Sequence, residues 1–178
     1  MNEKLDNTHE QKEGNIYLIG KLSSGENIYN TSNNHIHDNV EMESLLPQAL
    51  EKINSLNRDF FVESIDFGKI IGESRCVETS EKDEILYAQR KMRSGQTRFV
   101  KNKQLEPTSF LTVILKKIHG GYKIVSAFIG SKAEREPWDK SIRDNDELER
   151  SKSFWSTHAI VWGTERIIPG TETNKDQI

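Results

Sequence analysis

The residues best suited to chemistry lie in one short basic segment, residues 90–103, which reads RKMRSGQTRFVKNK. The segment contains no acid and six cations: Arg90, Lys91, Arg93, Arg98, Lys101 and Lys103. Guanidinium groups pair bidentately with phosphate oxygens, and several arginines together form an anion site. Because residues 93–96 (RSGQ) have the composition of a turn, we expect Arg90, Arg93 and Arg98 to converge around a hairpin and bind phosphate. Phe99 lies among these cations and would stack on a nucleobase if its ring is exposed.

The charge of the chain is sharply polarised by this segment. The whole chain carries a formal net charge of −3, so the residues outside the segment carry −9. The net charge alone speaks against a generic nucleic-acid binder, but the uneven distribution leaves an anion-binding face open. The alternative is a solvated basic hairpin that pairs with acids elsewhere in the chain or on a partner protein.

Two histidines precede an expected helix and are candidates for proton transfer. His35 and His37 form an H-x-H pair next to Asp38, and such a pair on a strand directs both rings to one face. An imidazole titrates near neutral pH, so His37 or His35 is the candidate general base. A metal site would need a third ligand at a recognisable spacing, and the sequence marks none. We therefore expect no metal and no cofactor; a plain polar loop is the ordinary alternative.

Other candidates are a third histidine and two strand hydroxyls. His158 follows two aromatic residues, where a buried, hydrogen-bonded histidine is the ordinary expectation and a catalytic acid is the alternative. Thr112 and Ser126 lie in neighbouring expected strands, where their hydroxyls can bind a phosphate or simply satisfy nearby groups. Residues 136–139 (EPWD) are expected to fix a loop over the sheet, with Trp138 as an apolar plug.

The elements that must position these residues follow from hydrophobic periodicity. Residues 15–28 predict a short hairpin. An apolar stripe at helical spacing then predicts an amphipathic helix: Met42, Leu45, Leu46, Ala49, Leu50, Ile53 and Leu56. Pro47 is compatible with this helix if it falls near the first turn. Strand-like runs follow at 60–67, 75–79 and 96–101, while 85–90 fits a strand or a helix end. The clearest pair, 110–117 and 122–128, flanks a Gly-Gly turn typical of a hairpin.

This order predicts an α+β fold, with the amphipathic helix packed on a twisted antiparallel β-meander of about four to six strands. Residues 1–14 and 169–178 are polar and predict flexible tails, which leaves a single domain over residues 15–168. Residues 130–150 are expected to form a polar loop. The single cysteine, Cys76, excludes a disulfide scaffold. The chain has no apolar stretch of membrane length and no signal peptide, so we expect a cytoplasmic protein without a membrane partner.

The helix, the meander, a histidine ahead of the helix and arginines in the central strands resemble a superfamily of small metal-independent ribonucleases. It includes barnase, EndoU, colicin-type tRNA nucleases and RelE-like toxins, and the chain looks especially similar to phage-encoded members. The resemblance covers residues 35–128 and is carried by residues 90–100 (RKMRSGQTRFV) and 112–128, which end in YKIVSAF.

The resemblance implies RNA cleavage without a metal. A base activates the ribose 2′-OH, cations stabilise the phosphorane, and an acid protonates the leaving 5′-oxygen, which gives a 2′,3′-cyclic phosphate. The roles would be taken by residues already singled out: His37 or His35 as base, Arg90, Arg93 and Arg98 around the phosphate, Ser126 or Thr112 beside it, and His158 as acid.

Two functions of different classes therefore remain open. The first is an RNA-cleaving or RNA-binding domain. The second is a non-enzymatic protein-binding module, such as a phage or toxin–antitoxin accessory factor, whose basic hairpin meets an acidic partner or inhibitor. A small-molecule-binding domain closed by the Trp138 loop is a third. The nuclease hypothesis requires His35 or His37 to lie within reach of the three arginines in one concave site.

Overall fold

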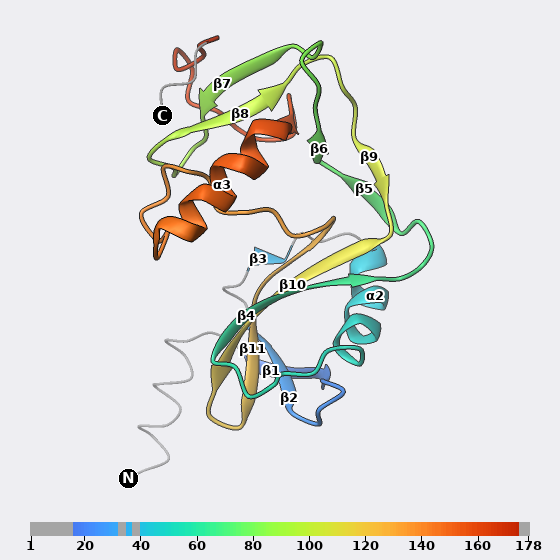
Figure 1. Cartoon of the computed structure of the whole chain (residues 1–178). Helices are drawn as coiled ribbons and strands as arrows, with labels where there is room; N and C mark the ends of the chain where they lie inside the picture. The colour runs from blue at the N-terminus through green and yellow to red at the C-terminus, as the bar shows by residue number, and fades with distance from the viewer. Residues whose placement is uncertain (1–15, 32–34, 37–39, 175–178) are drawn as a thin grey trace. The chain divides into compact units, whose positions relative to one another are not determined.

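The structure is a computed structural model that describes residues 16–31, 35–36 and 40–174. Their contacts divide the chain into two compact units (Figure 1). Unit 1 comprises Met1–Ile71 and Ser109–Lys132, and unit 2 comprises Gly72–Thr108 and Ala133–Ile178. The single domain expected over residues 15–168 stays a prediction, because a grouping of contacts does not test whether the two units fold together.

Unit 1 is a mixed sheet with a helix on one face. Its elements are β1 (Ile16–Lys21), β2 (Asn27–Thr31), β3 (His35–Ile36), α2 (Val40–Leu50), β4 (Phe60–Asp66), β10 (Phe110–Ile118) and β11 (Gly121–Ile129). The strand order is β1-β2-β11-β10-β4, and β3 also pairs with β11. Strands β2 and β3 run parallel to β11, whereas the expected meander would be antiparallel throughout. The α+β class is confirmed.

The predicted β10–β11 hairpin is confirmed and depends on its glycines. Gly120 and Gly121 have φ of +86° and +153°. Residues other than glycine rarely adopt such φ values. A Cβ on Gly121 would lie 2.2 Å from the carbonyl oxygen of Asn27. The second glycine therefore also lets β2 approach β11 closely.

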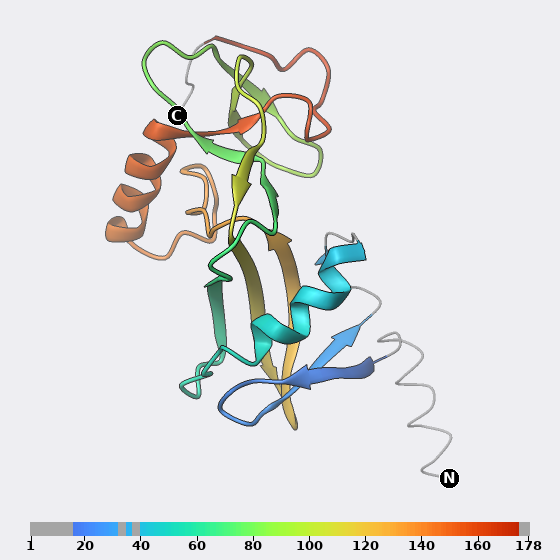
Figure 2. The same ribbon diagram turned by 90° about the vertical axis from the view of Figure 1, so that its right-hand side faces the viewer.

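Helix α2 lies across one face of the unit 1 sheet in Figure 2, and its apolar stripe is buried in the core of that unit. Met42, Leu46 and Leu50 are buried with sheet residues in one apolar core. The helix ends at Leu50, earlier than the stripe suggests, and Leu56 is 70% exposed. Pro47 lies in its second half, not in its first turn. The expected place of Pro47 near the first turn is therefore wrong, and a proline at this position removes the backbone hydrogen bond to the carbonyl four residues earlier.

Unit 2 contains a second sheet and the second described helix. Its elements are β5 (Gly72–Ser74), β6 (Cys76–Glu78), β7 (Ile85–Gln89), β8 (Gln96–Val100), β9 (Glu106–Thr108), α3 (Asn145–Thr157) and β12 (His158–Val161). The main sheet has the order β6-β12-β8-β7, and β5 pairs with β9. The polar loop expected over residues 130–150 is therefore partly wrong, because its last six residues begin α3.

The C-terminal segment of unit 2 lies along β7. Thr173 forms a bridge with Tyr87, and Ile167 forms one with Arg90. The sequence predicts a flexible tail from residue 169. In the structure, however, this segment forms backbone hydrogen bonds as far as Thr173, which bonds to Tyr87. Among the described helices, none is long and apolar enough to cross a membrane.

Candidate functional site

The basic segment forms the β7–β8 hairpin of unit 2. Tyr87 pairs directly with Arg98, and Gln89 pairs with Gln96. Directly paired residues project from the same face of an antiparallel ladder, so Tyr87 lies beside Arg98 on one face. In the turn that joins the strands, the side chain of Gln89 donates to the carbonyl of Arg93 at 2.6 Å, and the Arg93 side chain is exposed.

Arg90 is held by carboxylates of its own unit. Its Nη2 lies 2.6 Å from Glu136 Oε2, its Nη1 lies 3.6 Å from Glu165 Oε1, and its Nε donates to Thr97 Oγ1 at 2.9 Å. The Arg90 and Glu136 side chains are 13% and 8% exposed. Two carboxylates offset the charge of this arginine, so the arrangement favours a structural role for it.

A tryptophan fixes the loop that carries Glu136. Trp138 Nε1 donates to the carbonyl of Gln96 at 3.0 Å. A Cβ added to Gly95 would lie 2.1 Å from Trp138 Cγ, so the indole packs directly on the glycine backbone. Trp138 therefore fixes its loop on the turn before β8, as expected, while its role as an apolar plug over the sheet stays a prediction.

Arg98 has only neutral partners. Its Nη1 donates to Thr79 Oγ1 at 2.8 Å and to the His158 carbonyl at 2.9 Å. Within the described part of the chain, no carboxylate forms an ion pair with Arg98, and no group hydrogen-bonds its Nε or Nη2. These two atoms form the edge of the guanidinium that binds phosphate or carboxylate with two parallel hydrogen bonds. The side chain is thus oriented by Nη1, and its bidentate edge is left for a ligand.

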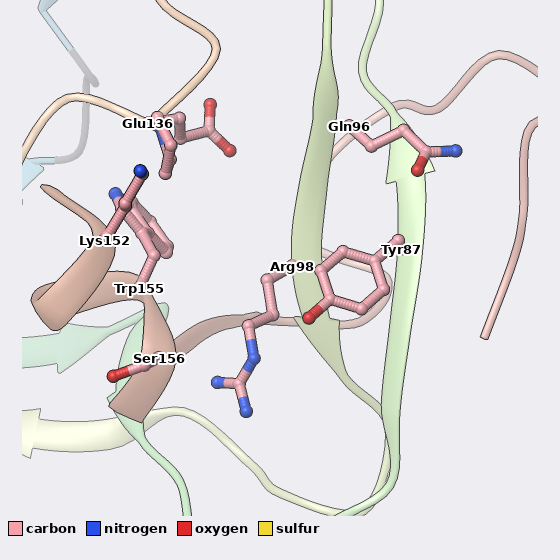
Figure 3. A pocket seen from close by; sticks show the side chains of 8 residues that line it. Tyr87, Gln96, Arg98, Glu136, Lys152, Trp155 and Ser156 are labelled. Atoms are coloured by element: carbon pink, nitrogen blue, oxygen red, sulfur yellow. The ribbon is translucent and has the colours of Figure 1, made fainter. Parts of the chain in front are cut away.

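Arg98 lines a pocket of about 460 Å³. The lining comes from the hairpin, the Trp138 loop and α3: Tyr87, Gln96, Arg98, Glu136, Pro137, Lys152, Trp155 and Ser156. In Figure 3, Glu136 and the Arg98 guanidinium lie at opposite ends, with the rings of Trp155 and Tyr87 on the two sides between them. The pocket therefore offers two cations, two aromatic rings and one buried carboxylate.

One acceptor in this pocket lacks a partner. Glu136 Oε2 is paired with Arg90, but no group of the described chain hydrogen-bonds its buried Oε1. Such an atom normally has a donor, because leaving a buried polar group unsatisfied costs about 1–3 kcal/mol. The second cation of the pocket, Lys152, is half-exposed, and its nearest carboxylate is Glu149 at 3.9 Å. Arg98 thus gives one end of the pocket a positive charge, and Lys152 adds a second cation on the side of the Glu136 carboxylate.

Helix α3 brings Lys152 and Trp155 to the pocket, and sequence reasoning missed both. The helix begins after Asp144, whose side chain accepts from the Glu147 amide at 2.9 Å, while Glu147 accepts from the Arg143 amide at 3.1 Å. This reciprocal arrangement resembles a capping box. The signal that could have found the helix is therefore the spacing Asp144-x-x-Glu147.

His158 lies beside Arg98 at the start of β12. Its ring stacks on Phe154 with centroids 4.0 Å apart and an interplanar angle of 5°. Its Nδ1 lies 3.0 Å from the Phe154 carbonyl. The same Nδ1 lies 3.0 Å from Thr157 Oγ1, so the tautomer of the ring sets whether Nδ1 donates to the carbonyl or accepts from the hydroxyl. The sequence predicts a buried, hydrogen-bonded histidine as the ordinary case; the hydrogen bond is observed, but the residue is only half-buried.

The remaining candidates belong to unit 1. His35 lies in β3 next to Ser126 of β11 in the parallel ladder, and His37 lies outside the described residues. Thr112 is fully buried; it donates to the Gly130 carbonyl at 2.7 Å and contacts Ser64 Oγ at 2.8 Å. His35 belongs to unit 1 and the three arginines belong to unit 2, so neither unit by itself contains the proposed catalytic constellation, which stays a prediction.

Two further expectations concern buried side chains. The Phe99 ring is completely buried, so the expected stacking of Phe99 on a nucleobase is wrong. Cys76 packs against an apolar cluster of unit 2, and burial raises its thiol pKa to about 11. Such a thiol is protonated and unreactive at neutral pH. No group of three potential metal ligands occurs among the described His, Cys, Asp and Glu residues.

A second hollow, of about 580 Å³, lies beside Trp138. Its lining contains no cation: Gln89, Ser94, Gly95, Gln96, Trp138, Gly170, Thr171, Glu172 and Thr173. Because Glu172 is the one charged group of this lining, the hollow is less suited to an anion than the Arg98 pocket.

Comparisons with known proteins assign no function to this site. No protein-family model matches the chain, and no curated protein matches its sequence. A conserved hypothetical protein from Toxoplasma gondii ME49, solved by crystallography, is similar with a TM-score of 0.48 and 15% identity. The match covers 71% of this chain and 87% of that chain. The resemblance to metal-independent ribonucleases therefore stays a prediction.

Proposed function

We propose that the chain binds single-stranded RNA through unit 2, with Arg98 holding a backbone phosphate. The observation that carries this proposal is the orientation of Arg98. Neutral partners fix its Nη1, and no carboxylate of the described chain occupies its bidentate edge. An arginine held in this way is pre-organised for a phosphate, which two parallel hydrogen bonds then bind.

The surroundings of Arg98 favour a nucleotide over a simple anion. Tyr87 lies next to Arg98 across the ladder, and Trp155 lines the same pocket. Aromatic rings bind bases by stacking, while cations follow the backbone. Lys152 adds a second positive charge to the pocket. A cytoplasmic location, where RNA is abundant, is part of the proposal.

Binding to a labelled single-stranded RNA, measured by fluorescence anisotropy, tests the proposal. We expect Arg98→Ala to weaken binding about tenfold or more, the scale of a lost charge-assisted hydrogen bond. Arg98→Lys keeps the charge but loses the bidentate edge, so it should also bind more weakly. Arg143→Ala is the matched control, because Arg143 is exposed and pairs with Glu147 away from the pocket. Equal affinity of wild type and Arg98→Lys would contradict a bidentate phosphate site.

RNA cleavage is the stronger form of the same proposal. We expect the purified chain to cut RNA in the presence of EDTA, with Arg98→Ala or His37→Ala lowering the rate about 100-fold or more. His158→Gln tests the candidate acid, since His158 supplies a backbone contact to Arg98 that this substitution keeps. RNA that stays intact while binding is normal would reject the enzymatic form and leave the binding form.

A protein partner is the alternative outcome. If Arg98 variants bind RNA as well as wild type does, the basic hairpin is better explained by an acidic partner surface. A pull-down that enriches one protein, resists RNase treatment and weakens with salt would identify that partner.

A further inference from the structure

One face of the unit 1 sheet carries a continuous row of side chains across five strands. The register pairs Phe60 with Lys116, Lys116 with Lys123, Lys123 with Tyr29, and Tyr29 with Leu18. Directly paired residues share a face, so these five side chains form one line from β4 to β1. We call this line the lysine row.

The lysine row faces away from α2. The residues that neighbour it in sequence, Phe61, Leu115 and Ile28, are buried in the core that contains α2. Successive residues of a strand point to opposite faces, so the row lies on the face of the sheet that does not carry α2. Phe60 is 51% exposed and Leu18 is 55% exposed, which shows that this face is open at both ends of the row.

The two central lysines of the row repel each other electrostatically. Lys116 and Lys123 are direct cross-strand neighbours, and like charges in that position destabilise a sheet. Within the described part of unit 1, neither forms an ion pair, whereas the adjacent Lys117 donates to Asn57 Oδ1 and approaches Asp59. A sequence that places two unpaired cations side by side, without a carboxylate to relieve them, favours a binding function there.

We propose that the lysine row is a second docking surface for single-stranded RNA, separate from the Arg98 pocket. The paired lysines bind backbone phosphates, whose charge relieves the repulsion between them. The rings of Phe60 and Tyr29, which flank the lysines in the row, stack on bases. Two adjacent cations with an aromatic ring on each side fit a nucleic-acid strand better than an acidic peptide, because a peptide carboxylate gives the flanking rings nothing to stack on.

The first test neutralises the pair. Lys116→Gln/Lys123→Gln should reduce the slope of log affinity against log salt for single-stranded RNA by about 1.4, since each phosphate contact to a single strand contributes about 0.7. Lys69→Gln/Lys82→Gln is the charge-matched control, because both lysines are exposed and lie outside the row. An unchanged slope in the first variant, or an equal reduction in the control, would overturn the proposal.

The second test separates binding from folding. Lys123→Glu places a carboxylate opposite Lys116, so it should raise the thermal midpoint while it weakens RNA binding. Phe60→Leu keeps an apolar side chain but removes the ring, and it should weaken binding about fivefold or more. If poly-glutamate displaced RNA from the lysine row at an equal concentration of negative charge, the row would be assigned to an acidic protein partner. That result would overturn the RNA proposal.

The experiments can reject either of the two RNA proposals independently of the other. If Arg98→Lys binds normally and Lys123→Glu binds weakly, the Arg98 pocket is wrong and the lysine row stands. The reverse result would reject RNA binding by the lysine row and support RNA binding by the Arg98 pocket.

Discussion

Arg90 and Arg98 lie on one hairpin, eight residues apart, and their surroundings are opposite in kind. Arg90 contacts Glu136 and Glu165. Arg98 contacts a hydroxyl and a backbone carbonyl. Both side chains are fixed, but carboxylates offset the charge of Arg90, whereas no carboxylate of the described residues pairs with Arg98.

The difference shows how one basic segment can serve folding and binding at once. A buried charge must be paired, and the pairing then leaves little for a ligand. An arginine held only by neutral acceptors keeps its charge and its orientation together. We therefore expect changes at Arg90 to affect mainly stability and changes at Arg98 to affect mainly binding.

The largest expected effect is that of Arg90→Ala. The substitution leaves the Glu136 carboxylate buried and unpaired, which should cost about 3–5 kcal/mol of unfolding free energy. Urea denaturation followed by circular dichroism measures it. The double variant Arg90→Ala/Glu136→Ala should lose less than the sum of the two single variants, because it leaves no unpaired buried charge. A loss below about 1 kcal/mol in Arg90→Ala would contradict the structural role of the pair.

Gly95→Ala should have the next largest effect. The new methyl group would meet the Trp138 ring, so the loop that carries Glu136 must move. We expect a loss of about 3 kcal/mol, at the upper end of the range for overpacking. RNA affinity sharpens the comparison. It should fall less in Gly95→Ala than in Arg98→Ala, because Thr79 and His158, which hold Arg98, lie outside that loop, although Glu136 and Pro137 line the pocket.

The same Gly95→Ala substitution in a Trp138→Ala variant tests whether contact with the Trp138 ring causes the loss of stability. In a Trp138→Ala chain, Gly95→Ala should cost little, since the space beside residue 95 is then empty. An equal cost in both backgrounds would assign the effect to the backbone of the turn instead of the ring.

The contrast between the two arginines could not be predicted from sequence. Glu136 is 46 residues from Arg90 along the chain, and no local spacing marks such a pair. The hairpin itself was predictable, because turn residues and alternating apolar residues are local signals. The sequence could therefore place three arginines near one turn but could not tell which of them has an acid beside it.

Helix α3 was missed for a related reason. Its buried positions are Glu147, Ser151 and Trp155, so two of the three residues facing the unit are polar. Hydrophobic periodicity finds a helix only when its buried side is apolar. Ser151 donates to the Arg135 carbonyl and Glu147 binds Arg143, so hydrogen bonds replace apolar contacts on this face. Helix α2, with its buried Met42, Leu46 and Leu50, was predicted because its buried side is apolar.

Arg98→Ala should destabilise the chain less than Arg90→Ala does. It removes two hydrogen bonds to neutral acceptors and leaves no charge buried, so we expect a loss of about 1–2 kcal/mol. The same variant should show the larger loss of RNA affinity. Thermal unfolding and anisotropy on both variants give a direct comparison. If Arg98→Ala unfolded more easily than Arg90→Ala, the division of roles between the two arginines would be reversed.

The smallest effect is expected at Glu147, where a buried carboxylate pairs with exposed arginines. Hydrogen bonds from the Arg143 amide and then from its guanidinium lower the pKa of Glu147 in the folded chain, although burial opposes them. A lowered folded pKa means that this carboxylate stabilises the fold at pH values above its unfolded pKa of about 4.3. The stabilisation is then lost as the pH falls through the lower folded pKa.

The Glu147→Gln variant tests this sign. It should be less stable than wild type at pH 7, and the difference should shrink as the pH is lowered from about 4.3. Glu149→Gln is the control, because Glu149 is exposed and its ion pair with Lys152 is 3.9 Å long. Its difference from wild type should be small at every pH. A Glu147 difference that stayed constant down to low pH would mean that packing, and not charge, is what the carboxylate contributes to the start of α3.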